Sequence, residues 1–282
     1  MLRNVGFAFL VALTPVAALS TGCVVECQDQ DGVTVCQAEN AVRFEAAAIR
    51  ETVAYTAGSS IDIQGANGTI KVVRGSGSEV SVSVVPFILD KASNEDNARA
   101  HMEKNLQVSA TADAGRVLIR VTRASGSSGA LGGDLTVSIP SSFDGDFSVV
   151  QGNGSVEVDL SGATPASTKV VNDGAGSITV QGARGLLELV ASTGDVDADI
   201  AAWSASGTGR IFSDNGDITL AVPAAADGTM SLLASDQLTE PTLPAEWLVA
   251  GEGSAKSYTM GAGTGGHVDV TADFGSIAFT VR

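Results

Sequence analysis

A short motif recurs along the chain and constrains its fold more than any other feature: a glycine, then a serine or aspartate, then a β-branched aliphatic residue. From Gly154 to Gly216 the successive copies begin 22, 18 and 22 residues apart, and another follows 59 residues later. The aligned glycines, with an earlier copy included, are Gly68, Gly154, Gly176, Gly194, Gly216 and Gly275. A period of about 20 residues predicts a stack of similar units that pack on their neighbours.

The chemistry of the motif favours β-strands that turn at each glycine. Glycine adopts the positive φ of a tight corner at little cost. The strand after it can point one aliphatic side chain inward and the next residue outward. We therefore predict an all-β fold, a right-handed parallel β-helix or β-solenoid with coils of about 20 residues. An antiparallel β-sandwich, which also has short and evenly spaced strands, is the alternative.

The same alternation begins before the repeats. Short apolar–polar runs start at Val53, and Val80 to Val84 is the clearest of them. Residues Ser93 to Leu106 interrupt the pattern with a segment that lacks β-branched residues and that Ser93 or Asn94 can cap. We expect one short surface helix there, within a single β-solenoid domain over residues 53–282.

The first 22 residues resemble the signal of a bacterial lipoprotein. Arg3 precedes an apolar stretch from Val5 to Leu19, which is too short to span a membrane. Small residues then lead to Cys23, as in a lipobox, where the cysteine receives the lipid after cleavage. We predict a signal peptide at 1–22 and acylation of Cys23, for example with palmitate. Val24 after the cysteine favours the outer membrane by analogy with lipoprotein sorting, and ordinary cleavage to a secreted protein is the alternative.

All three cysteines lie between positions 23 and 36. If Cys23 carries lipid, Cys27 and Cys36 remain as an even pair in an exported and therefore oxidising setting. They flank the turn-forming residues Asp31 and Gly32. We predict a disulfide between Cys27 and Cys36 in a tether that covers residues 23–52.

The charge balance limits the partners of the chain. Its net charge is −16, so binding to nucleic acid, which requires a basic face, is disfavoured. An acidic surface also repels anionic membranes, so a lipid and not electrostatic attraction would hold the protein there. Aromatic residues make up only 5 %, which suits a narrow interior of small aliphatic side chains.

Taken in order, these motifs resemble those of the bacterial putative-adhesin domain family. The run Leu135 to Pro140 ends a strand in Ile-Pro, and turns of the type Asn-Gly-Ser-Val and Asn-Gly-Asp-Ile follow it. The resemblance covers Val53 to Arg282. It implies a head-GIN-like, β-helical surface lipoprotein that is not an enzyme and that binds a protein or glycan ligand. No catalytic residue, cofactor or metal ligand comes with the family.

A few residues are candidates for other chemistry. Asp195, Asp197 and Asp199 alternate along one strand and share a face, where they could bind calcium or serve a polysaccharide-active enzyme. A solvated outer face is the simpler interpretation. His267 begins a strand with no evident partner, so we expect it at a sheet edge. Trp203 and Trp247 are expected to pack against the fold, with sugar stacking as the alternative.

Overall fold

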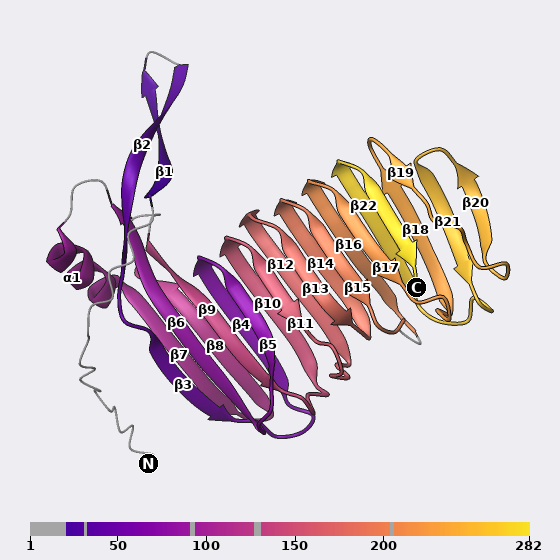
Figure 1. Cartoon of the computed structure of the whole chain (residues 1–282), viewed down its shortest axis with the longest axis horizontal. Coiled ribbons are helices and arrows are strands. Elements are labelled where there is room, and N and C mark those ends of the chain that lie inside the picture. The colour runs from indigo at the N-terminus through magenta and orange to yellow at the C-terminus, as the bar shows by residue number, and fades with distance from the viewer. Residues whose placement is uncertain (1–20, 31–32, 91–93, 127–130, 204–205) are drawn as a thin grey trace.

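The computed structural model describes residues 21–30, 33–90, 94–126, 131–203 and 206–282. Within these ranges the chain forms 23 strands and one α-helix, arranged as two large sheets (Figure 1). The predicted all-β class is confirmed. The predicted signal segment lies, except for its last two residues, outside the described residues.

The first sheet contains 12 of the described strands in the spatial order β1-β2-β6-β9-β5-β11-β13-β15-β17-β23-β19, with β3 paired to β6. Its strands are β1 (Thr21–Gln30), β2 (Val33–Glu45), β3 (Ile49–Ala54), β5 (Ile70–Gly75), β6 (Glu79–Asp90), β9 (Leu131–Pro140), β11 (Val156–Asp159), β13 (Ile178–Ala183), β15 (Val196–Ile200), β17 (Ile218–Val222), β19 (Leu238–Thr239) and β23 (Ile277–Val281).

The second sheet contains 11 described strands in the order β20-β21-β18-β22-β16-β14-β12-β10-β4-β8-β7. These are β4 (Ser60–Asn67), β7 (Leu106–Asp113), β8 (Arg116–Arg123), β10 (Asp146–Asn153), β12 (Ser167–Ala175), β14 (Leu186–Thr193), β16 (Thr208–Asn215), β18 (Gly228–Ala234), β20 (Leu248–Glu252), β21 (Ala255–Met260) and β22 (His267–Phe274).

The helix lies where the sequence predicts it. Helix α1 (Glu95–Asn105) begins after Asn94, whose side chain accepts a hydrogen bond from the Asn97 amide at 2.9 Å. Such a cap satisfies one of the amides that the first turn leaves unpaired. Across the described residues, no helix has the length and apolar character needed to cross a membrane.

In the middle of the molecule consecutive strands alternate between the two sheets. Strands β10, β12, β14, β16 and β22 pair in parallel in the second sheet, and β11, β13, β15, β17 and β23 pair in parallel in the first. Each pair of consecutive strands, such as β12 and β13, is thus one coil that contributes one strand to each sheet. An antiparallel sandwich does not have this pairing.

The motif glycines lie one above another where each coil passes from the second sheet to the first. A Cβ at Gly154 would lie 2.0 Å from the carbonyl oxygen of Gly68, and one at Gly275 would lie 2.2 Å from that of Gly216. Gly176 and Gly194 meet the backbone of the preceding corner in the same way. Close backbone approach requires glycine at each of these corners, and Gly154, Gly176 and Gly194 also have a positive φ.

The segment between Gly216 and Gly275, which are 59 residues apart, is not filled by further coils of the regular kind. After β17 the chain forms β18 and β19 as an outlying coil and then a hairpin of β20 and β21. It then returns to insert β22 between β16 and β18, and β23 between β17 and β19. The last coil in sequence is therefore not the last in space (Figure 1).

Both ends of the stack carry antiparallel strands, so each sheet is mixed. At one end β7 pairs antiparallel with β8, and β6 pairs antiparallel with β2, β3 and β9. At the other end β21 pairs antiparallel with β18 and β20. The hairpin of β1 and β2 projects from the body of the molecule (Figure 1).

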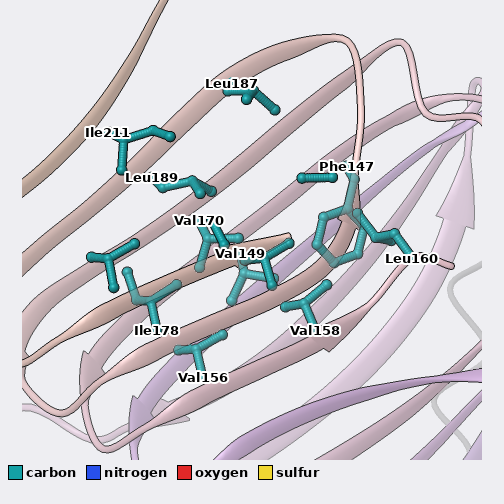
Figure 2. Packing of buried hydrophobic residues seen from close by; sticks show 14 of the residues in the cluster. Phe147, Val149, Val156, Val158, Leu160, Val170, Ile178, Leu187, Leu189 and Ile211 are labelled. Carbon is teal, nitrogen blue, oxygen red and sulfur yellow. The ribbon is translucent and has the colours of Figure 1, made fainter. Parts of the chain in front are cut away.

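The core lies between the sheets and is built of layered aliphatic side chains. Val149, Val170 and Leu189 point inward from the second sheet, opposite Val156 and Ile178 from the first (Figure 2). All of these are buried, and the residues between them along each strand face outward. Burial of these stacked rows provides most of the driving force for folding. The interior is therefore filled, which leaves the outer faces to contact other molecules.

Candidate functional site

The outer face of the second sheet is the most distinctive surface of the described chain. The parallel register lines up its outward side chains across β10, β12, β14, β16, β22 and β18 into rows. The apolar row consists of Val150, Val171, Val190, Phe212, Thr271 and Leu233. The charged row, two residues earlier on each strand, consists of Ser148, Lys169, Glu188, Arg210, Asp269 and Ser231.

The apolar row is unusual for a sheet face that meets solvent. Three valines and Phe212 are half-buried, and Leu233 at the end of the row is 52 % exposed. Outward positions of a half-buried strand are ordinarily polar. Thr271 alone interrupts the row. Five of the six outward side chains in this row are therefore apolar, which makes the row a candidate surface for interaction.

The charged row alternates in sign across four neighbouring strands. The Lys169 ammonium contacts the Glu188 carboxylate at 2.7 Å. The Arg210 guanidinium lies over the ring of Phe212, 4.2 Å from its centroid, and so links the charged row to the apolar row. Asp269 follows Arg210 in the register. The sequence of charges along the row is therefore positive, negative, positive, negative.

His267 lies in the same face, and the expectation of an edge position is wrong. Its strand β22 is paired on both sides, and the two ring nitrogens of His267 lie 2.8 Å from Thr229 Oγ1 and 2.9 Å from Asp269 Oδ1. Thr229 is 38 residues earlier in the chain and becomes a neighbour only because β22 inserts beside β18. The sequence analysis did not predict this pair, because no local pattern indicates that β22 inserts beside β18.

The Thr229–His267–Asp269 cluster has the composition of a nucleophile, a base and an acid. The Thr229 amide, however, already donates to the Gly266 carbonyl at 3.0 Å, as part of the backbone pairing. Acyl transfer needs amides that point at the developing oxyanion, in a pocket that excludes water. The cluster lies on the outer side of a sheet, and its hydrogen bonds join neighbouring strands β18 and β22.

The three predicted aspartates do not form one site. Asp195 Oδ1 accepts a hydrogen bond from the Asp217 amide at 2.9 Å, and Asp199 pairs with Arg282. Asp197 stands exposed on β15 between Thr179 and Thr219 of the neighbouring strands. In the part of the chain that the structure describes, no group of three or more His, Cys, Asp or Glu residues is arranged to hold a metal ion.

The role of Asp195 explains the second position of the motif. The Asp195 carboxylate connects its corner to the next by accepting from the Asp217 amide. The Asp217 carboxylate in turn accepts from the Ser276 amide at 2.8 Å. Asp134 accepts from the Thr69 amide at 2.8 Å in the first of the stacked corners. The acidic residues after the glycines are thus structural, because they satisfy backbone amides that the turn leaves unpaired.

Buried polar residues line the inner side of the same corners, and sequence reasoning missed them. Asn172 is fully buried and donates to the carbonyls of Gly154 and Gly176 at 3.0 and 2.6 Å. Ser213 donates to Gly194 at 3.0 Å, and Gln151 donates to Gly68. The equivalent positions on β14 and β22 are Ala191 and Ala272, so the polar residue recurs at only some of the corners and leaves a weak signal in the sequence.

Both tryptophans pack against the fold, as expected. Trp247 is 5 % exposed within the core. Trp203 is half-buried and donates from Nε1 to the Gly266 carbonyl at 3.1 Å, beside a hollow of about 430 Å³. Asp227 borders the hollow, but both of its oxygens accept from Thr264, and these hydrogen bonds lower the pKa of the Asp227 carboxyl. The polar groups of this hollow are therefore already engaged within the protein.

The three cysteines lie in the projecting hairpin. The antiparallel register of β1 and β2 brings Cys27 directly opposite Cys36, and Cys23 opposite Asn40. Directly opposed Cα atoms are within the separation that a disulfide spans. The turn residues Asp31 and Gly32 lie outside the described residues.

Two solved structures are similar to the chain at low identity. One is a putative cell adhesion protein from Clostridium sporogenes, with 11 % identity over 84 % of this chain and 100 % of that chain and a TM-score of 0.49. The other is a putative adhesin from Bacteroides fragilis, with 15 % identity over 83 % of this chain and 97 % of that chain and a TM-score of 0.34. No family model matches the chain, and neither does any curated protein. Membership of the family that the motifs resemble stays a prediction.

Proposed function

We propose that the chain is a cell-envelope lipoprotein whose β-solenoid domain is a non-enzymatic scaffold for an adhesin-like binding face. The apolar row on the second sheet carries the proposal, because it exposes aliphatic side chains in the middle of a stack whose interior is already full. An aliphatic row suits a protein surface.

The anchor part of the proposal rests on the sequence around Cys23. A signal-like segment precedes it, small residues flank it, and the acidic chain repels anionic membrane surfaces. Several acyl chains on one cysteine would hold the protein firmly. Val24 favours attachment at the outer membrane. In this proposal the hairpin of β1 and β2 lies next to the lipid, and a Cys27–Cys36 disulfide closes it.

The absence of enzymatic activity is also a proposal, and it rests on how polar side chains are used. Asp195 and Asp199 are engaged in structural contacts, and Asp197 stands between two threonines on an open face. A glycosidase needs two carboxyl groups that flank one bond of the substrate. The Thr229–His267–Asp269 cluster likewise has no available amide at Thr229 to stabilise an oxyanion.

Mass spectrometry of the mature protein tests the anchor. The chain is expressed with its own signal in a bacterial host, and the N-terminal peptide is analysed after thiol alkylation with and without reduction. We expect a chain that starts at Cys23 with acyl groups, and Cys27 and Cys36 that alkylate only after reduction. In the Cys27→Ser control the lipid is retained and Cys36 alkylates directly. An unmodified Cys23, or a mature chain that starts elsewhere, overturns the anchor.

A further inference from the structure

We propose that the partner of the binding face is a second copy of this chain, docked face to face through the second sheet. This inference rests on the binding face of the proposed function and names its occupant. The twofold axis would run parallel to the strands, between β14 and β16. It would reverse the order of the strands in the second copy, so that each row would face the same row of the second copy. Such an interface is isologous, so it forms a closed dimer.

The charged row is complementary to itself under this operation. The axis sets Glu188 opposite Arg210 of the second copy, and Lys169 opposite Asp269 of the second copy. Each contact occurs twice, which makes four pairs of opposite charge. A relative shift of the two copies by one strand sets like charges against each other, and a shift by two strands leaves two pairs of opposite charge instead of four.

The other positions agree with the same axis. In the apolar row Val190 meets Phe212 of the second copy, and Val150 meets Leu233 of the second copy. Thr271, the residue that interrupts the row, meets Val171 of the second copy, so Thr271 does not face a charged side chain. At the ends of the charged row Ser148 meets Ser231. Among the possible axes parallel to the strands, the one between β14 and β16 makes the largest number of pairs of opposite charge along the charged row.

The expected interface is modest in area. Three outward rows enter the estimate: the apolar row, the charged row, and the row two residues before the charged row that contains Thr208, His267 and Thr229. Six strands spaced by about 4.8 Å and these three rows spaced by about 6.8 Å cover about 600 Å² per copy. The total of about 1,200 Å² lies at the low end for specific protein interfaces. Packed sheets cross at about 30°, which would shift the Lys169–Asp269 pair by about 4 Å, within reach of a lysine side chain. We therefore expect a dissociation constant on the order of micromolar.

Sedimentation equilibrium of the full chain tests the inference. Cys23→Ser is used as the reference protein, so that acyl chains do not drive association, at concentrations from about 1 to 500 µM, a range set by the expected affinity. We expect a reversible rise from the mass of one chain, 28.3 kDa for the full sequence, to twice that mass. A chain that stays monomeric over the whole range overturns the proposal.

Charge reversal tests the register. Lys169→Glu alone and Asp269→Lys alone each convert two attractive pairs into two repulsive ones and should weaken the dimer at least tenfold. The double variant restores opposite charges and should recover the affinity. Strands β12 and β22 are three strand spacings apart, about 14 Å, so the two residues cannot rescue each other within one copy. Failure of the double variant to recover rejects the proposed axis.

Lys71→Glu is the matched control on the outer face of the first sheet. Lys71 pairs with Glu157 at 3.1 Å and is exposed like Lys169, so this variant makes the same charge change at a comparable site. It should leave the dissociation constant unchanged, and an equal weakening would show that net charge and not the face governs association. The result is separable from the anchor test, because a lipidated chain that remains monomeric keeps the anchor and rejects only self-association.

Discussion

The central coils and the C-terminal end of the stack are held together by different interactions. In the centre two contacts repeat from coil to coil: glycine on glycine at the corner, and aliphatic rows inside. At the C-terminal end β20 is exposed along its whole length, and β21 is fixed by a cluster of unique side chains. The centre is a periodic structure, and the end is a single arrangement that occurs once.

The C-terminal cluster consists of Tyr258, Glu240 and Lys256. The buried hydroxyl of Tyr258 donates to Glu240 Oε1 at 2.5 Å, and Lys256 donates to the other carboxylate oxygen. The ring of Tyr258 packs edge to face on Phe279 at 5.1 Å between centroids. This cluster ties the loop after β19 to β21 and closes the end of the apolar interior.

The largest effect is expected from the corners of the central coils. At Gly176 φ is +135°, and an added Cβ would lie 2.5 Å from a backbone carbon of Gly154. Gly176→Ala therefore combines backbone strain with a clash that neither strand can relieve alone. We expect a loss of about 3 kcal/mol in the free energy of unfolding, measured by urea denaturation.

Gly58→Ala is the matched control for the corner. Gly58 has a φ of +79°, and a Cβ there would meet no heavy atom within 4 Å. This variant should cost only the backbone strain, about 1 kcal/mol. Equal losses at the two positions would contradict the claim that close stacking requires the motif glycines.

The motif corners could be predicted from the sequence because every such corner meets the same steric demand. Gly154, Gly176 and Gly194 share one environment, so the demand appears as a repeated residue at a regular spacing. The amide-capping role of Asp195 and Asp217 leaves the same kind of periodic trace. A steric demand that repeats at every corner selects the same residue at a regular spacing. The all-β class and the corner positions can therefore be predicted from the sequence.

The ends and the insertion could not be predicted, for the corresponding reason. The insertion of β22 beside β18 brings His267 to Thr229, and this contact is made once, between segments 38 residues apart. The pairing of Tyr258 with Glu240 is equally singular. The rows on the outer face of the second sheet become visible only when the register of six strands is known, because each strand contributes a single residue to each row.

Removal of the Tyr258 hydroxyl should have the next largest effect. Tyr258→Phe keeps the ring against Phe279 and leaves the Glu240 carboxylate without one of its two donors. We expect a loss of about 1–2 kcal/mol in the free energy of unfolding, since the bond is buried and one partner is charged. Tyr55→Phe is the control, because that hydroxyl bonds the exposed Asp144 at 2.8 Å and should cost less. A larger loss at Tyr55 would contradict the role of the cluster.

The smallest effect is expected from titration of the same cluster. Burial of Glu240 acts to raise its pKa, but the hydrogen bonds from Lys256 and Tyr258 outweigh burial and hold the pKa below its usual value of 4.5. A carboxyl whose pKa is lower in the folded than in the unfolded state stabilises the fold fully above the unfolded value, and this contribution is lost as the pH falls through the folded value. The free energy of unfolding should therefore decline as the pH falls below the usual carboxyl pKa of 4.5, and Glu240→Gln should make the decline shallower. Asp144 and Asp227, whose pKa values are also lowered by hydrogen bonds, provide the background slope that remains in the variant. Identical slopes in the two proteins would show that the C-terminal cluster does not contribute to the pH dependence, and that the end of the stack is held by its apolar contacts alone.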